Sequence, residues 1–261
     1  MKPMDKKSGK KKAFTIIELL TVMSVIILLI GLLAPALQSF KRYAKRVKQK
    51  SQFHSIEVAL DLFNAENEEY PPSAPLGENY NGAQKLCEAL MGQDMLGFHP
   101  GSTFRIADNI LYTSTAGTGH IRELKGPALQ LDNANAHRMV DIITSLPKTN
   151  DPNYVLCDVY RTGTKEGMPI LYYRADKTRY QPDGSDYVYY YTDNSAIVLL
   201  KQPPAEWDQS IFQKMILNHN VGGMPNWPHR ADSYILHSAG FDGKYGTSDD
   251  LFNFERTDLG Y

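Results

Sequence analysis

Hydrophobic positions in the first quarter of the chain follow two patterns, and both predict helix. No residue from Leu19 to Leu37 is charged, and a helix of this length would nearly span the ~30 Å hydrocarbon core of a membrane. Beyond this run, apolar residues recur at steps typical of an amphipathic helix: Phe40, Tyr43, Ala44, Val47, Phe53, Ile56, Ala59, Leu60 and Phe63. Pro71-Pro72 stops the pattern, because a residue before proline favours extended conformations. We predict one helix over residues 14–66, with its lower half in lipid and its upper half under a folded head.

The remainder of the chain shows helix only in short stretches and then strand patterns. Residues 71–110 are rich in Gly, Pro, Asn and Ser, with a helical patch at Ala83–Met91, and residues 126–147 are mixed, partly irregular or helical. Strand patterns follow at 154–161, 170–174, 186–192, 195–201 and 234–238. Asp193-Asn194 is a candidate hairpin turn between two of them. The predicted fold class is therefore α+β, a long N-terminal helix packed on a C-terminal antiparallel β-sheet head.

Charge is distributed unevenly along the 261 residues, although the net charge is only -1. Residues 1–50 carry 12 basic and 2 acidic residues, which leaves 16 basic and 27 acidic residues for the rest. A basic, apolar N-terminus on an acidic body indicates a membrane-proximal stalk and a solvent-facing head. The acidic head argues against nucleic acid as a partner, because phosphate binding needs a basic surface.

Glu18 lies at the start of the uncharged run, and the N-terminus has three interpretations. A cleaved secretory signal peptide would explain the preceding lysines and the small residues at Ala34–Ala36, but its apolar region is normally shorter. A plain single-span anchor is the second interpretation, with the carboxylate reaching toward the headgroups. Basic residues on both flanks of the run leave its orientation open. The third interpretation rests on the residues around Glu18.

The segment Lys-Ala-Phe-Thr-Ile-Ile-Glu (12–18) resembles the processing site of type IV prepilins and type II secretion pseudopilins. The resemblance implies cleavage by a prepilin peptidase between Ala13 and Phe14, N-methylation of Phe14, and Glu18 as the fifth mature residue. Pro35 then falls where this family commonly places a helix-bending proline. Ala13 departs from the glycine that usually precedes the cut. The implied organisation is a leader at 1–13, a transmembrane and stalk helix at 14–66, and an exported, pilin-like head at 67–261.

The resemblance also implies how subunits would assemble. Leader removal frees the amine of Phe14, and Glu18 of one subunit can neutralise the Phe14 amine of its neighbour. Pairing offsets much of the cost of a carboxylate in low dielectric, and a head-to-tail contact of this kind grows as an open helix. The implied partners are other pilin or pseudopilin subunits and the assembly machinery of the bacterial inner membrane. The chain would span that membrane once, with its head in the periplasm or outside the cell.

A second informative stretch, residues 238–255, places three carboxylates among glycines. Asp242, Asp249 and Asp250 lie within nine residues, and hard oxygen ligands on a flexible loop suit Ca2+. The stretch resembles the C-terminal calcium loop of the major pseudopilin of type II secretion. That resemblance implies side-chain ligands from these aspartates and carbonyl ligands near Ser238, Tyr245 and Thr247. A solvated acidic turn is the alternative.

No pattern in the chain indicates an enzyme. The seven histidines are scattered, and HExxH, GxSxG, P-loop and GxGxxG patterns are missing. Cys87 and Cys157 could form a disulfide in an oxidising compartment or remain buried thiols. We therefore expect a structural subunit of a type II secretion pseudopilus or of a surface pilus. A membrane-anchored protein that binds a calcium-dependent ligand without polymerising is the alternative.

Overall fold

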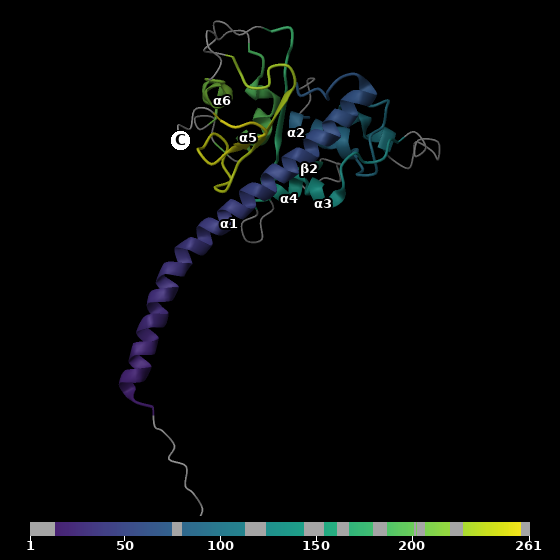
Figure 1. Cartoon of the computed structure of the whole chain (residues 1–261). Coiled ribbons are helices and arrows are strands. Elements are labelled where there is room, and N and C mark those ends of the chain that lie inside the picture. The colour runs from purple at the N-terminus through teal and green to yellow at the C-terminus, as the bar shows by residue number, and fades with distance from the viewer. Residues whose placement is uncertain are drawn as a thin grey trace, which may run out of the picture. The chain divides into compact units, whose positions relative to one another are not determined.

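The computed structural model describes residues 14–74, 80–112, 124–143, 154–160, 167–179, 187–200, 202, 207–219 and 227–256 (Figure 1). The predicted leader, residues 1–13, lies outside these ranges, and so does the cleavage-site residue Ala13. Contacts within the chain divide it into two compact units, Met1–Ala44 and Lys45–Tyr261.

One long helix, α1 (Ile16–Asn67), runs through both units and confirms the predicted N-terminal helix. Every side chain from residue 16 to residue 44 is exposed. An 18-residue window of α1 has a mean hydropathy of 2.8, so the helix is long and apolar enough to cross a membrane. Pro35 lies inside the helix, where it has no N–H to donate to the carbonyl of Gly31.

The C-terminal half of α1 (residues 45–67) is amphipathic and packs on the head. Phe53, Ile56 and Leu60 are buried, and they share one cluster with residues of α2 (Gly82–Met91) and of the sheet. Full burial of such side chains contributes roughly 1.5–3 kcal/mol each. This apolar face therefore fixes α1 against α2, which confirms the short helix predicted at Ala83–Met91.

A three-stranded antiparallel sheet forms the central layer of the head, in the order β3 (Leu171–Arg174), β4 (Tyr234–Ser238) and β5 (Leu251–Phe252). Successive residues of a strand point to opposite faces. Tyr172 accordingly lies in the cluster with α1, whereas Tyr173 lies in a second cluster with Phe212 of α6 (Gln209–Ile216). The α+β class is thus confirmed, with helices on both faces of the sheet.

The middle of the chain forms smaller elements around a two-stranded sheet. These elements are η1 (Ile106–Tyr112), α3 (Leu131–Ala134), β1 (Ala136–Arg138), α4 (Met139–Ile142) and β2 (Tyr154–Leu156). Strands β1 and β2 are antiparallel, and β2 packs beside α2. The elements α3, β1 and α4 agree with the mixed character predicted for residues 126–147, of which residues 144–147 lie outside the described ranges.

Two predicted strands are wrong, and so is the hairpin turn between them. Residues 187–190 form no strand and lead into the 3-10 helix η4 (Tyr191–Asp193), and the segment predicted as the second strand forms the helix α5 (Ser195–Leu199); residues 186 and 201 lie outside the described ranges. Asn194 joins the two and makes long-range bonds: its Oδ1 accepts from the amide of Ala83 at 2.8 Å, and its Nδ2 donates to the carbonyl of Tyr172 at 2.7 Å. These bonds tie the segment to α2 and β3 and take the place of the predicted strand pairing.

Candidate assembly and calcium sites

The first turn of α1 holds Glu18 through a reciprocal capping arrangement with Thr15. The amide and hydroxyl of Thr15 donate to Glu18 Oε2 at 3.2 and 3.0 Å, and the amide of Glu18 donates to Thr15 Oγ1 at 3.3 Å. This is a capping box, which satisfies backbone donors that a helix start would otherwise leave unpaired. Glu18 therefore has a role within its own chain, which the Thr-x-x-Glu spacing at residues 15–18 already indicates in the sequence.

Phe14 precedes this capping box, and its side chain is 79% exposed. Phe14 and Glu18 lie four residues apart at one end of an exposed apolar helix. The structure thus places two of the predicted assembly residues at the same helix terminus.

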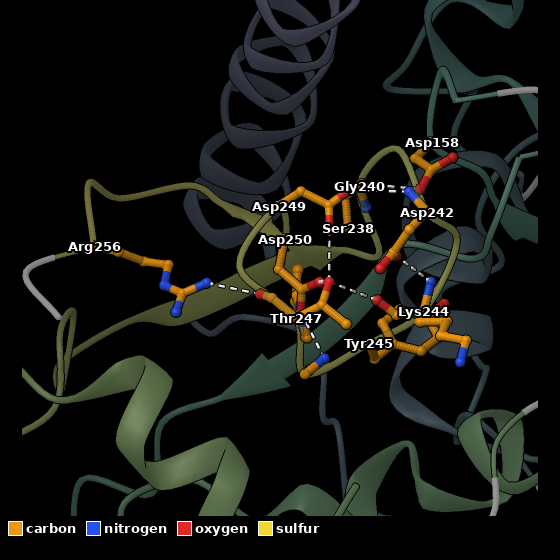
Figure 2. Close-up of polar contacts among 12 residues, drawn as sticks. Asp158, Ser238, Gly240, Asp242, Lys244, Tyr245, Thr247, Asp249, Asp250 and Arg256 are labelled. Carbon is orange, nitrogen blue, oxygen red and sulfur yellow. Dashed lines mark hydrogen bonds and ion pairs between the residues drawn. The ribbon is translucent and has the colours of Figure 1, made fainter. Parts of the chain in front are cut away.

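The predicted calcium loop connects β4 to β5, and the side chain of Asp249 accepts hydrogen bonds from backbone amides in the first half of the loop (Figure 2). Asp249 Oδ2 accepts from the amides of Phe241 and Asp242 at 2.6 and 2.9 Å. Gly240 has φ of +69°, and a Cβ there would lie 2.4 Å from the carbonyl oxygen of Asp249. Only glycine fits this close approach, so the two ends of the loop meet at Gly240 and Asp249.

The buried side chain of Asp250 accepts hydrogen bonds from groups in the second half of the loop. Its Oδ2 accepts from the amide of Gly246 at 2.7 Å and lies 2.6 Å from Nε2 of His237, and its Oδ1 accepts from the hydroxyl of Thr247 at 3.1 Å. His237 is itself buried and stacks on Phe252, with ring centroids 4.3 Å apart. The role of His237 could not be predicted from the sequence, because its contact with Asp250 depends on how β4 and β5 pair.

Asp242 is the most exposed of the three aspartates, and its Oδ1 accepts from the amide of Lys244 at 2.8 Å. Partial desolvation raises the pKa of the Asp242 carboxyl, and the charges of Asp249 and Asp250 raise it further. The negative charges of Asp249 and Asp250 therefore disfavour the ionised form of Asp242, an effect that a nearby cation would oppose.

Two of the carbonyl groups predicted as further ligands have protein partners in the structure. The carbonyl of Tyr245 accepts from Gln202 Nε2 at 2.9 Å, and the carbonyl of Thr247 accepts from Arg256 Nη1 at 3.0 Å. Across the described ranges, no three His, Cys, Asp or Glu side chains converge closely enough to hold a metal ion. The donor chemistry of the loop fits Ca2+, while its aspartates are held by backbone amides and hydroxyls. Calcium binding remains a prediction.

A fourth carboxylate, Asp158, lies beside the calcium loop and was not predicted. Asp158 Oδ2 accepts from the hydroxyl of Ser238 at 2.9 Å, and Oδ1 accepts from the amides of Tyr160 and Met168 at 3.2 and 3.1 Å. Burial raises the pKa of Asp158 to about 7, although all three donors oppose the rise. Asp158 and Ser238 are 80 positions apart in the sequence, which explains why the sequence did not reveal the contact.

Cys87 and Cys157 are both buried as thiols, with no disulfide between them in the structure. Cys87 lies in α2, and Cys157 follows β2 directly and donates weakly to the carbonyl of Val155. Burial raises the pKa of the Cys87 thiol. The structure thus corresponds to the buried-thiol alternative rather than to the disulfide.

Comparisons with known proteins add relatives to these observations. No family model and no solved structure matches the chain. The chain is similar to the type II secretion system core protein G of Escherichia coli, with 28% identity over 110 residues that cover 36% of this chain and 76% of the relative. The corresponding protein of Klebsiella pneumoniae is 26% identical over 150 residues, covering 54% of this chain and 91% of the relative. That of Pectobacterium carotovorum is 34% identical over 62 residues, covering 24% and 40% respectively. These similarities confirm the resemblance of this chain to the pseudopilins of type II secretion.

Proposed function

We propose that this protein is a structural subunit of a type II secretion pseudopilus. The observation that carries the proposal is the exposed apolar half of α1, which begins two residues after Phe14 and holds Glu18 in its first turn. Similarity to core protein G of three bacteria favours a secretion pseudopilus over a surface pilus. The names of these relatives denote components of a secretion system and no catalytic activity, in agreement with the expectation that the chain is not an enzyme.

Processing would convert the chain into its assembly-competent form. A prepilin peptidase would cut between Ala13 and Phe14, separating the leader at 1–13 from the helix at 14–66 and the head at 67–261. The mature subunit would remain in the bacterial inner membrane through the apolar half of α1. Its head would face the periplasm, where the secretion machinery could reach it.

Assembly would bring the Phe14 amine of one subunit to Glu18 of the next. Glu18 already accepts from Thr15, so the incoming ammonium would join a carboxylate that is oriented before the subunits meet. A buried carboxylate without a cationic partner is disfavoured by several kcal/mol. Any register that separates the two groups is therefore penalised, and the pair selects one arrangement of neighbouring helices.

Calcium would bind the loop between β4 and β5 through Asp242, Asp249 and Asp250. Carbonyl groups near Ser238, Tyr245 and Thr247 would complete the coordination shell after giving up their present donors. A bound dication neutralises the mutual repulsion of the aspartates and cross-links the two ends of the loop. The loop would then be held more firmly to the sheet.

A filament assay with two Glu18 variants tests the proposal. Glu18→Gln retains an acceptor for Thr15 but removes the charge, whereas Glu18→Asp keeps the charge on a shorter side chain. We expect Glu18→Gln to abolish filaments seen by electron microscopy of cells expressing the secretion system, while the subunit remains in the membrane at normal levels. Normal filaments containing Glu18→Gln would overturn assembly through this pair, whereas filaments that lack the wild-type subunit would support the non-polymerising, calcium-dependent binding protein.

A further inference from the structure

We propose that Arg46, Lys50 and Arg256 form a binding site for the phosphate of an anionic phospholipid headgroup, at the level where α1 leaves the membrane. The inference rests on the proposed insertion of the apolar half of α1 into the membrane. It depends neither on polymerisation nor on calcium. It is carried by a positively charged pocket between α1 and the chain around β5, together with the place of this pocket along α1.

The pocket is small, with a volume of about 110 Å³. Arg46 and Lys50 line it from α1, whereas Phe252, Phe254 and Arg256 line it from β5 and the residues that follow this strand. Sites for drug-sized ligands normally measure ~300–1,000 Å³. The pocket therefore suits a small charged headgroup rather than a bulky ligand or a long peptide.

Three positive charges surround the pocket. Arg46 and Lys50 are exposed and lie four positions apart, so their side chains share one face of the helix. The guanidinium of Arg256 lies 6.0 Å from the ring centroid of Phe252, and its Nη1 donates to the carbonyl of Thr247 at 3.0 Å (Figure 2). These contacts orient the third charge beside the other two. Arg and Lys are the side chains that bind phosphate through charge-assisted hydrogen bonds.

Two carboxylates also line the pocket, but they leave it with a net positive charge. The side chain of Asp250 is completely buried and pairs with His237 inside the head. The side chain of Glu255 is 86% exposed and forms an ion pair with Lys50. Exposed pairs of this kind contribute little to stability, so a phosphate can take the place of Glu255 beside Lys50.

The sequence of α1 places Arg46 near the membrane surface. No residue from Leu19 to Phe40 is charged, and Lys41 is the first charged residue after Glu18. The hydrocarbon core around this run therefore ends near Lys41. Arg46 follows five positions later in the same helix, a rise of about 8 Å. The headgroup layer on each side of the hydrocarbon core is roughly 5–8 Å thick, so Arg46 lies at the outer edge of the headgroups.

The residues around this level favour an anionic membrane surface. Residues 41–50 include six Lys or Arg, and residues 19–56 include no Asp or Glu. Tyr43 is 66% exposed, and tyrosine is enriched where membranes meet water. Clusters of basic residues beside a membrane span attract anionic lipids. This attraction concentrates anionic headgroups near the pocket, where Arg46, Lys50 and Arg256 converge on one phosphate.

Native mass spectrometry of the full chain in detergent tests the site. The protein is titrated with phosphatidylglycerol and with zwitterionic phosphatidylcholine, and calorimetry measures the binding of inorganic phosphate. Arg46→Gln/Lys50→Gln removes two charges of the pocket. Lys41→Gln/Lys48→Gln is the matched control, because it removes two exposed charges from the same part of α1 outside the pocket. Arg256→Gln tests the pocket from the side opposite α1.

We expect the wild type to bind phosphatidylglycerol at least tenfold more tightly than phosphatidylcholine. Arg46→Gln/Lys50→Gln should raise the dissociation constant for phosphatidylglycerol about tenfold more than Lys41→Gln/Lys48→Gln does, because only the pocket residues bond to the phosphate. Arg256→Gln should also weaken binding of phosphatidylglycerol, although it leaves the charges of α1 unchanged. A melting temperature close to that of the wild type confirms that each variant is folded.

Equal losses of affinity in the two double variants would reduce the binding to general attraction by basic residues and overturn the site. Equal affinity for the two lipids would overturn it as well. Inorganic phosphate that binds as tightly as phosphatidylglycerol, with the same dependence on Arg46 and Lys50, would assign the pocket to the free ion. Pocket variants that bind lipid normally but form no filaments would assign it to an acidic segment of a second subunit.

The outcome for this site is separate from the outcome for assembly. Failure of lipid binding leaves assembly through Glu18 in place, since the filament assay of Glu18→Gln measures that contact. Loss of assembly through Glu18 likewise leaves the lipid site in place. A full chain that does not enter membranes would overturn both.

Discussion

Burial of the Asp193 carboxyl in the head predicts a measurable dependence of folding stability on pH. The residue ends η4, is 5% exposed, and accepts from the hydroxyl of Ser73 through Oδ2. Burial raises the pKa of its carboxyl from 3.8 to about 6, although the bond from Ser73 and the charge of Lys85 oppose the rise. The folded state therefore holds the proton of Asp193 more tightly than the unfolded state does.

The direction and size of the pH effect follow from this difference. Because the pKa is higher in the folded state, the contribution of Asp193 to stability is fully present below about pH 4 and is lost as pH rises through about 6. A difference of about two pH units corresponds to at most about 3 kcal/mol. An asparagine side chain at this position does not titrate, so Asp193→Asn should remove this part of the pH dependence.

The assay is urea unfolding of the full chain in detergent, followed by tryptophan fluorescence, at pH 4.5 and pH 7.5. We expect the loss of unfolding free energy between these pH values to be smaller in Asp193→Asn than in the wild type by about 2 kcal/mol. Asp132→Asn, at an exposed position, serves as the control and should behave as the wild type does. An Asp193→Asn variant with the wild-type pH dependence would refute the reasoning.

Three further predictions concern calcium, packing and the helix start. Removing calcium with a chelator should lower the melting temperature of the head, and an unchanged melting curve would contradict a bound cation in the loop. Gly82→Ala should destabilise the head by about 1–3 kcal/mol in urea unfolding, because the added Cβ would lie 2.2 Å from the carbonyl oxygen of Tyr172. Gly126→Ala is the control and should leave stability unchanged, because a Cβ there would meet no atom within 4 Å. Thr15→Ala should cost about 1 kcal/mol of helix stability and speed amide exchange at Glu18, and an unaffected exchange rate would show that the capping box is not formed.

Elements with long, regular patterns could be predicted from the sequence. The repeat of apolar residues up to Phe63 predicted α1 within two residues of its observed ends, and β3 and β4 lie within the predicted strands at 170–174 and 234–238. The segment 195–201 was too short for its periodicity to decide between helix and strand. Its helix depends on Asn194, whose partners Ala83 and Tyr172 are distant in the sequence.

Site residues that lie close together in the sequence were predicted, whereas site residues that meet only in the folded structure were missed. Asp242, Asp249 and Asp250 belong to one loop, so their proximity could be predicted from spacing alone. His237 reaches Asp250 through the pairing of β4 with β5. Asp158 reaches its partner on β4 from the end of β2, across two sheets. Contacts of this kind depend on tertiary structure and leave no local pattern in the sequence.

The central claim, a processed subunit that polymerises through α1, is tested most directly by the intact mass of the protein from membranes of its native host. The account predicts a mass that lacks Met1–Ala13 and includes one added methyl group on Phe14. The full-length mass would contradict it: the Phe14 amine would remain in a peptide bond, and Glu18 could not neutralise it in a neighbouring subunit. Glu18 would then serve only as the partner of Thr15 in the capping box of α1.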